Sequence, residues 1–157
     1  MRACPNERDE EGLTMKRLLV PLDGSPLAET ILPVAEEWAK EEEAEVILLR
    51  AVLARHGPGG GNSAAQVRAV EEGEAYLQGV ADRLERRGIE QVRRAVWYDE
   101  PAAAIARAAA RDDVDMIAMA THGRSGLSRL LLGSVAAGVL RGAPVPVLLF
   151  KAGERGL

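Results

Sequence analysis

Apolar runs of strand length recur along the chain and are separated by segments of helical periodicity. Each run is mostly apolar, which is typical of strands that are buried on both faces of a parallel sheet. The predicted strands span Arg17–Leu22, Glu45–Val52, Val92–Tyr98, Met116–Ala120 and Val145–Phe150.

Between these runs, apolar residues recur at the three- and four-residue spacing of amphipathic helices. The first helix runs from Ala28 to Ala39, has Trp38 on its core face and should be kinked at Pro33. Three further helices are predicted to pack on the sheet through Val67 to Leu84, through Ile105 with Ala109, and over Val135–Arg141. Gly88 marks the end of the first of these and Pro101 the start of the second. Strictly alternating strands and helices predict an α/β fold with right-handed crossovers and a doubly wound, Rossmann-like parallel sheet.

Three segments lack this periodicity. Residues 1–14 are polar and are predicted to be a disordered extension, and 153–157 a flexible tail. Residues 53–63 are rich in glycine and are predicted to be a flexible linker, because the glycines have neither the Lys-Ser/Thr of a P-loop nor GxGxxG spacing. A single domain is therefore expected over 15–152, and the length of 157 residues is too short for two ordinary domains.

Composition narrows the function classes. The net charge of −4 argues against a nucleic-acid binder, which normally has a basic face. Cys4 is the single cysteine, so an internal disulfide is excluded. No apolar run reaches the roughly 18 residues of a membrane span, and the first residues lack the apolar segment of a signal peptide. We expect a cytoplasmic protein that does not enter a membrane.

Few side chains point to catalysis. The close acids Asp112, Asp113 and Asp115 are typical of a turn between helix and strand, although such a group also suits a metal. His122 and His56 have no partnered base, so we expect no catalytic residue and no protein-held metal. Asp23 follows the first strand, where it is either a turn former or a carboxylate facing a ligand at the carboxyl end of the sheet.

The stretch Ala120–Ser134 is the best candidate for a ligand site. It holds Gly123 and Gly133 between a predicted strand and a predicted helix, so its backbone N–H groups suit a phosphate. Arg124 can supply positive charge, while the lack of a lysine beside Gly133 excludes a Walker A loop. A plain glycine-rich connection with a serine cap is the alternative.

With these motifs, the chain resembles the universal stress protein family from Met15 to Lys151. The resemblance rests on Val20-Pro-Leu-Asp-Gly-Ser25, on Gly123 followed after nine residues by Gly133-Ser134, and on Ala143-Pro-Val-Pro-Val-Leu-Leu149. The ATP-binding branch of the family has the pattern Gly-2x-Gly-9x-Gly-Ser/Thr. This chain departs from the pattern at position 120, where it has an alanine in place of the first glycine of the pattern.

The resemblance implies the adenine-nucleotide α-hydrolase-like fold, with sheet order 3-2-1-4-5 and ATP, or AMP or ADP, held where strands one and four part. Mg²⁺ or Mn²⁺ would bridge the phosphates. A homodimer would form through Val145–Phe150, whose apolar edge also favours pairing. The nucleotide-binding residues would be Pro21, Leu22, Asp23, Ala51, Met119, Ala120, Gly123, Arg124, Gly133, Ser134, Val135 and Ala136.

Two departures leave alternatives open. A positive φ at Ala120 would cost about 1 kcal/mol or more, whereas an ordinary β conformation costs little. Ala136 replaces a common hydroxyl residue. The leading hypothesis is an ATP-binding stress-response regulator with slow or no hydrolysis, and the alternative is a dimeric interaction protein that binds no nucleotide. A phosphoacceptor receiver with Asp99, Thr121 and Lys151 is disfavoured, as is a nucleotidyl transferase, whose signature loops are missing.

Overall fold

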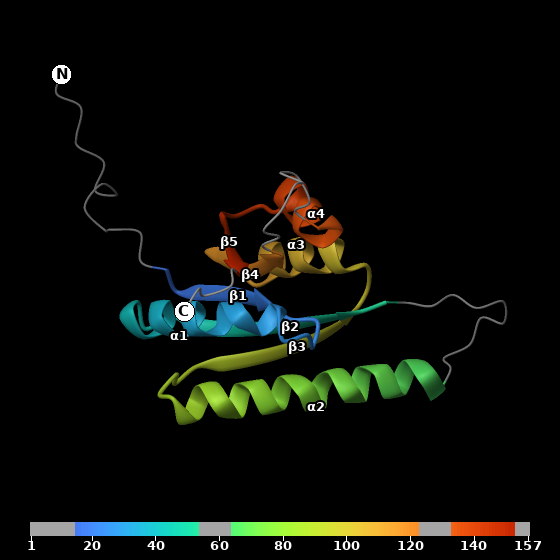
Figure 1. The fold of residues 1–157 in the computed structure, drawn as a ribbon, viewed down its shortest axis with the longest axis horizontal. Helices are drawn as coiled ribbons and strands as arrows, with labels where there is room; N and C mark the ends of the chain where they lie inside the picture. Colours follow the sequence, from blue (N-terminus) through green and yellow to red (C-terminus); the bar gives the residue numbers. More distant parts are fainter. Residues whose placement is uncertain (1–14, 54–63, 123–132, 153–157) are drawn as a thin grey trace, which may run out of the picture.

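The computed structural model describes residues 15–53, 64–122 and 133–152, and it forms a parallel five-stranded sheet with helices on both faces (Figure 1). The predictions for 1–14, 54–63 and 153–157 lie outside the described residues. The strand order is β3-β2-β1-β4-β5, as the resemblance implied. The strands are β1 (Arg17–Pro21), β2 (Glu45–Val52), β3 (Val92–Tyr98), β4 (Met116–His122) and β5 (Val147–Ala152). The helices are η1 (Ala28–Ile31), α1 (Leu32–Glu41), α2 (Ala64–Arg86), α3 (Pro101–Arg111) and α4 (Ser134–Gly142).

The predicted strands are all present, and two have the predicted bounds. β5 starts two residues later than predicted, after Pro146, which has no N–H to donate to a ladder. Its carbonyl still accepts a hydrogen bond from Ile117 N at 3.0 Å. β4 continues past Ala120 to His122, so Ala120 lies inside a strand.

The first helical segment differs from its prediction. Instead of one helix kinked at Pro33, a short 3-10 helix, η1, precedes α1. Pro33 then lies in the first turn of α1, where its missing N–H breaks no helical hydrogen bond. Trp38 is half-buried rather than enclosed in the core.

The core has two layers, one on each face of the sheet. Alternate residues of β2 face opposite layers, with Val46 and Leu48 toward α1 and α2, and Ile47 and Leu49 toward α3 and α4. Figure 1 shows α2 on one side of the sheet and the α3–α4 pair on the other. This two-sided burial explains why the strands are continuous apolar runs.

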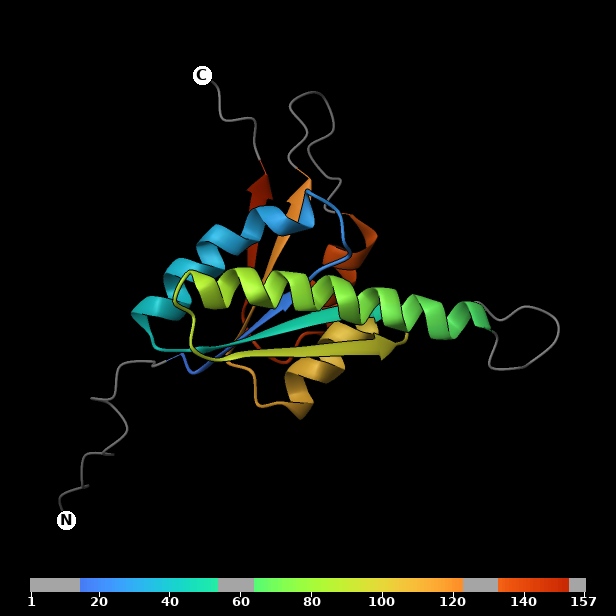
Figure 2. The same cartoon turned by 90° about the horizontal axis from the view of Figure 1, so that it is seen from below.

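Helix α2 extends past the end of the sheet, as Figure 2 shows. Leu77, Val80 and Leu84 are buried as predicted, but Val67 is 47% exposed. The prediction for Val67 is wrong because the first turns of α2 project beyond the strands. Gly88 has a φ of +94°, which confirms it as the stop after the helix.

The acidic turn before β4 has a structural role. Asp115 Oδ2 accepts hydrogen bonds from the backbone N–H groups of Lys16 and Arg17, at 2.8 Å each. Asp112 pairs with Arg93 at 3.3 Å. In the described part of the chain, no group of three potential ligands could hold a metal ion.

Candidate functional site

Strands β1 and β4 separate toward their carboxyl ends. β1 pairs with β2 along its whole length, from Arg17 to Pro21. It pairs with β4 only through Leu18–Met116 and Leu19–Ile117. The chain reverses its winding direction between these two strands, and open α/β sheets bind ligands at such a point.

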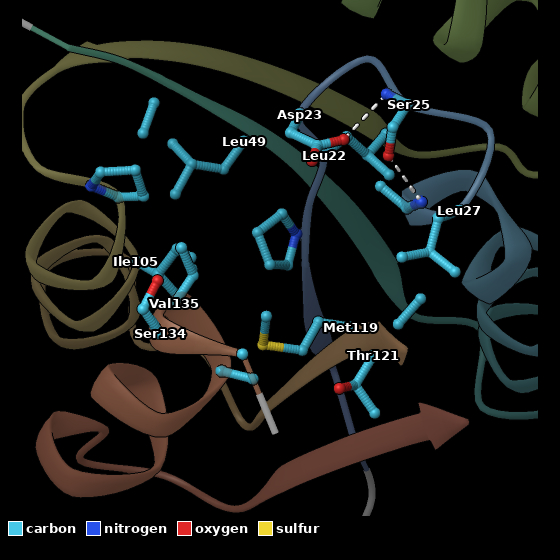
Figure 3. Close-up of a pocket in the computed structure, with 17 residues that line it drawn as sticks. Leu22, Asp23, Ser25, Leu27, Leu49, Ile105, Met119, Thr121, Ser134 and Val135 are labelled. Atoms are coloured by element: carbon cyan, nitrogen blue, oxygen red, sulfur yellow. Dashed lines mark hydrogen bonds between the residues drawn. The ribbon is translucent and has the colours of Figure 1, made fainter. Parts of the chain in front are cut away.

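A cavity of about 280 Å³ lies at this opening (Figure 3). It brings together ten of the twelve residues predicted for the site, and Gly123 and Arg124 lie outside the described residues. In Figure 3, Asp23 and Ser25 lie on one side and Ser134 and Val135 on the other. The ten residues are Pro21, Leu22, Asp23, Ala51, Met119, Ala120, Gly133, Ser134, Val135 and Ala136.

Seven lining residues were not predicted. Pro101 and Ile105 of α3 form part of the wall, although helical spacing indicated only that Ile105 faces inward. Ser25 and Thr121 carry hydroxyl groups and lie in the two stretches that the sequence analysis had identified as ligand-facing. Those hydroxyls could have indicated that the two residues line the cavity. The remaining three, which carried no sequence signal, are Leu27, Ala28 and Leu49.

Asp23 forms a turn at the rim of the cavity. Its Oδ1 accepts a hydrogen bond from Ser25 N at 2.8 Å, and Ser25 Oγ accepts one from Ala28 N at 3.1 Å. Gly24 between them has a φ of +87°, which favours glycine. The turn-forming interpretation of Asp23 is therefore confirmed. The side chain is also exposed and lines the cavity, so the turn does not prevent contact with a ligand.

The opposite wall is the amino terminus of α4. Gly133 is its N-cap residue, with φ +77° and ψ 146°, and makes no side-chain capping bond. Ser134, Val135 and Ala136 form the first turn and line the cavity. The N–H groups of a first helical turn have no partner within the helix and carry partial positive charge. This wall therefore suits an anionic group.

Ala120 has no unfavourable backbone conformation. It lies in β4 opposite Phe150. Among the described non-glycine residues, positive φ angles occur at Glu43 and Asp113 and not at Ala120. The strain considered for Ala120 is thus excluded, and the low-cost alternative holds. His122 ends β4.

The middle of the cavity is apolar. Leu22, Met119 and Ala136 are buried, with 3%, 7% and 4% of their surfaces exposed. Among the described lining residues, Asp23 is the one charged side chain. An apolar centre between a carboxylate and a helix amino terminus can hold a flat, partly apolar molecule with a hydroxyl at one end and an anion at the other.

The receiver hypothesis conflicts with the sheet order. In a receiver domain the third strand lies centrally, in the order 2-1-3-4-5. Here β3 is an edge strand, and β2 and β1 separate Asp99 from Thr121. Asp99 instead forms an ion pair with Arg107 of α3.

Fold and cavity together define a doubly wound α/β protein with a ligand cleft between its first and fourth strands. Comparison with known families identifies it further. Residues 14–151 match the model of the universal stress protein family. The chain belongs to that family, as its motifs indicated.

Individual relatives agree. A universal stress protein of Methanocaldococcus jannaschii is 33% identical over 140 residues, which are 87% of this chain and 82% of that protein. One of Mycobacterium tuberculosis is 36% identical over 141 residues, which are 85% of this chain but only 45% of the relative. The chain thus spans less than half of the mycobacterial protein.

Two solved structures have the same fold. One is a universal stress protein in complex with cAMP, with a TM-score of 0.69 and 21% identity over 89% of this chain and 99% of that one. The other, from Archaeoglobus fulgidus in complex with dAMP, has a TM-score of 0.66 and 21% identity over 87% and 98%. In the described ranges of our chain, no helix is both long and apolar enough to cross a membrane.

Proposed function

We propose that this protein binds an adenine nucleotide in the cavity between β1 and β4 and acts as a nucleotide-responsive regulator in the stress response. The observation that carries the proposal is the cavity itself, with Asp23 on one wall and the amino terminus of α4 on the other. Family members with the same fold hold cAMP and dAMP, and these ligands share an adenine, a sugar and a phosphate.

Each part of the nucleotide has a matching wall. Asp23 would bond the ribose, which Met119 and Ala120 flank, and the backbone of Ala51 would meet the adenine. The N–H groups of Ser134 to Ala136 would bind the phosphates, since helix amino termini favour anions. Gly123 and Arg124, outside the described residues, would complete this end. Mg²⁺ or Mn²⁺ would bridge the phosphates of ATP.

We expect hydrolysis to be slow or absent. Among the described residues that line the cavity, the one carboxylate, Asp23, lies on the wall opposite Ser134 and is the residue assigned to the ribose. Attack on a terminal phosphate needs a group that orients or activates water near the phosphates. A nucleotide that stays bound suits regulation better than turnover.

Calorimetric titration with ATP and AMP, with and without Mg²⁺, tests the proposal. Gly133→Val is the matched variant, because a β-branched residue is strained at φ +77°. It should weaken nucleotide binding and abolish ligand-linked thermal stabilisation. Gly142→Ala is the control, since its new Cβ would lie 3.8 Å from Ala106 Cβ, an ordinary contact.

Absence of heat with folded wild-type protein at sub-millimolar nucleotide would refute the proposal. The alternative, an interaction protein that binds no nucleotide, would then stand. This alternative rests on two departures from the family pattern, Ala120 and Ala136. The first now argues less strongly for it, because the backbone of Ala120 is unstrained. Ala136 still lacks the hydroxyl that often occurs there.

The proposed functional unit is a homodimer that pairs through β5. This strand is at one edge of the sheet and consists mostly of apolar residues. Exposed apolar edges are usually paired or covered. Sedimentation equilibrium at micromolar concentration should give twice the chain mass, and a monomer would contradict the proposal.

A further inference from the structure

Arg50 of β2 packs against the turn that carries Asp23. A Cβ added to Gly24 would lie 3.0 Å from Nη1 of Arg50, so the guanidinium lies directly against the backbone of this turn. Arg50 does not itself line the cavity. It therefore contacts a wall of the cavity from behind.

The side chain of Arg50 is fixed along its length. Its guanidinium carbon lies 5.1 Å from the centre of the Tyr76 ring in α2. A Cβ at Gly73 would approach Arg50 Cδ to 3.4 Å, so the glycine leaves room for the arginine stem. Such a stack on an aromatic face restricts a long side chain that would otherwise be free to move.

Tyr76 is held in turn by its hydroxyl. The hydroxyl donates a hydrogen bond to Glu29 Oε1 at 2.9 Å, and Glu29 Oε2 pairs with Arg83 at 2.6 Å. Burial raises the pKa of Tyr76, as does the nearby Glu29 carboxylate, so the hydroxyl stays a donor. The stack under the turn thus rests on a network that joins η1 to α2.

The charge of Arg50 serves none of the ion pairs formed by the described residues. These pairs join other arginines and Lys40 to carboxylates. A half-buried guanidinium without a carboxylate partner carries a desolvation cost. The contacts of Arg50 include Gly73, the Tyr76 ring and the backbone of the Asp23–Ser25 turn at Gly24, and the last of these points to a role at that turn.

From this geometry we propose that Arg50 is a positioning residue for nucleotide binding: it holds the Asp23–Ser25 turn so that the Asp23 carboxylate meets the ribose hydroxyls. The inference rests on the proposed function, because it needs Asp23 to bond the ribose. It adds a residue outside the cavity that sets the preference for a hydroxylated sugar.

The test compares affinities for AMP, 2′-deoxy-AMP and 3′-deoxy-AMP by calorimetry. Arg50→Met keeps an apolar stem and removes the guanidinium. It should weaken AMP binding about tenfold and the deoxy ligands less than about threefold, so the preference for ribose shrinks. Arg50→Lys keeps the charge without the planar group and should behave like Arg50→Met. Asp23→Asn supplies the reference for full loss of the preference.

Arg111→Met is the matched control. Arg111 stacks on Trp97 at 5.6 Å, and neither residue lines the cavity. This variant also loses one arginine and one aromatic stack, but all three affinities should stay within about twofold of wild type. Thermal unfolding of each variant establishes that it is folded at the assay temperature.

Distinct results separate the possible failures. Unchanged affinities in both Arg50 variants would overturn the role of Arg50 and leave the proposed function intact. An equal loss of affinity for all three ligands would also overturn the role of Arg50, because the loss would then not depend on the contact between Asp23 and the ribose hydroxyls. If wild-type protein binds none of the ligands, the proposed function fails and this inference fails with it.

Discussion

The close packing of α3 against α4 gives a quantitative test of the structure beside the cavity. A Cβ at Gly138 would lie 2.7 Å from Ala102 Cβ, whereas contacting carbon atoms normally lie about 3.5–4.0 Å apart. Neither atom belongs to a flexible side chain, so Gly138→Ala must push the two helices apart by about 1 Å. Overpacking of this kind costs about 1–3 kcal/mol.

A second effect has the opposite sign. Alanine in a helix interior is about 1 kcal/mol more favourable than glycine, and Gly138 lies in the middle of α4. Gly138→Ala alone should therefore lower the free energy of unfolding by about 0–2 kcal/mol. In a chain that carries Ala102→Gly, the clash is gone and the same substitution should raise it by about 1 kcal/mol.

Urea unfolding of the wild type, both single variants and the double variant measures this difference. The expected coupling between the two positions is about 1–3 kcal/mol, or roughly 2–12 °C in Tm for a domain of this size. The pair Gly142 and Ala106, whose Cβ atoms would be 3.8 Å apart, is the control and should show little coupling. A coupling below about 0.5 kcal/mol at Gly138 would refute the close approach of the helices.

Three further predictions concern single residues. Ala120→Gly should change nucleotide affinity by less than about threefold, since there is no positive φ to relieve; a gain of tenfold or more in a calorimetric titration would show that the methyl group obstructs the ligand. Asp115→Ala removes the hydrogen bonds from the N–H groups of Lys16 and Arg17, at 2.8 Å each, and should lower the free energy of unfolding by about 1–3 kcal/mol. An unchanged urea midpoint would contradict this. The hydrogen bond from Lys40 to Glu36 holds the pKa of the Glu36 carboxyl below its ordinary 4.5. A group with a lowered folded pKa stabilises the protein above its unfolded pKa and loses that effect as the pH falls through the folded one. The stability difference between wild type and Glu36→Gln should therefore shrink as the pH falls below the ordinary carboxyl pKa of 4.5, and a difference independent of pH would exclude the effect.

The fold was largely readable because its strands are buried on both faces. This burial makes each strand a continuous apolar run, so β2 and β3 were predicted with their observed bounds. Two predictions failed, one about the effect of a proline on a helix and one about how far a helix extends beyond the sheet. Pro33 begins a helix instead of kinking one, and Val67 lies beyond the sheet that would have covered it.

Residues of the candidate site could be predicted from the sequence where they belong to a short, continuous motif. The turn at Asp23 and the start of α4 at Gly133 each have short-range signatures, and both line the cavity. Ile105 and Leu49 have no such signature. They face the cavity because α3 and β2 pack where they do, and apolar spacing does not distinguish a cavity wall from a filled core.

The sequence by itself determined the alternation of strands and helices, the glycine-serine start of α4 and the family. The tertiary structure decided where β1 and β4 part, after Leu19, which opens the cavity. It confirmed the sheet order that the resemblance implied, with β3 at the edge, which excludes a receiver. It also decided that Arg50 lies behind Asp23 and that Ala120 is unstrained. The physical reason is that hydrophobic period and turn chemistry are properties of neighbouring residues, whereas strand separation and side-chain stacking depend on residues distant in the chain.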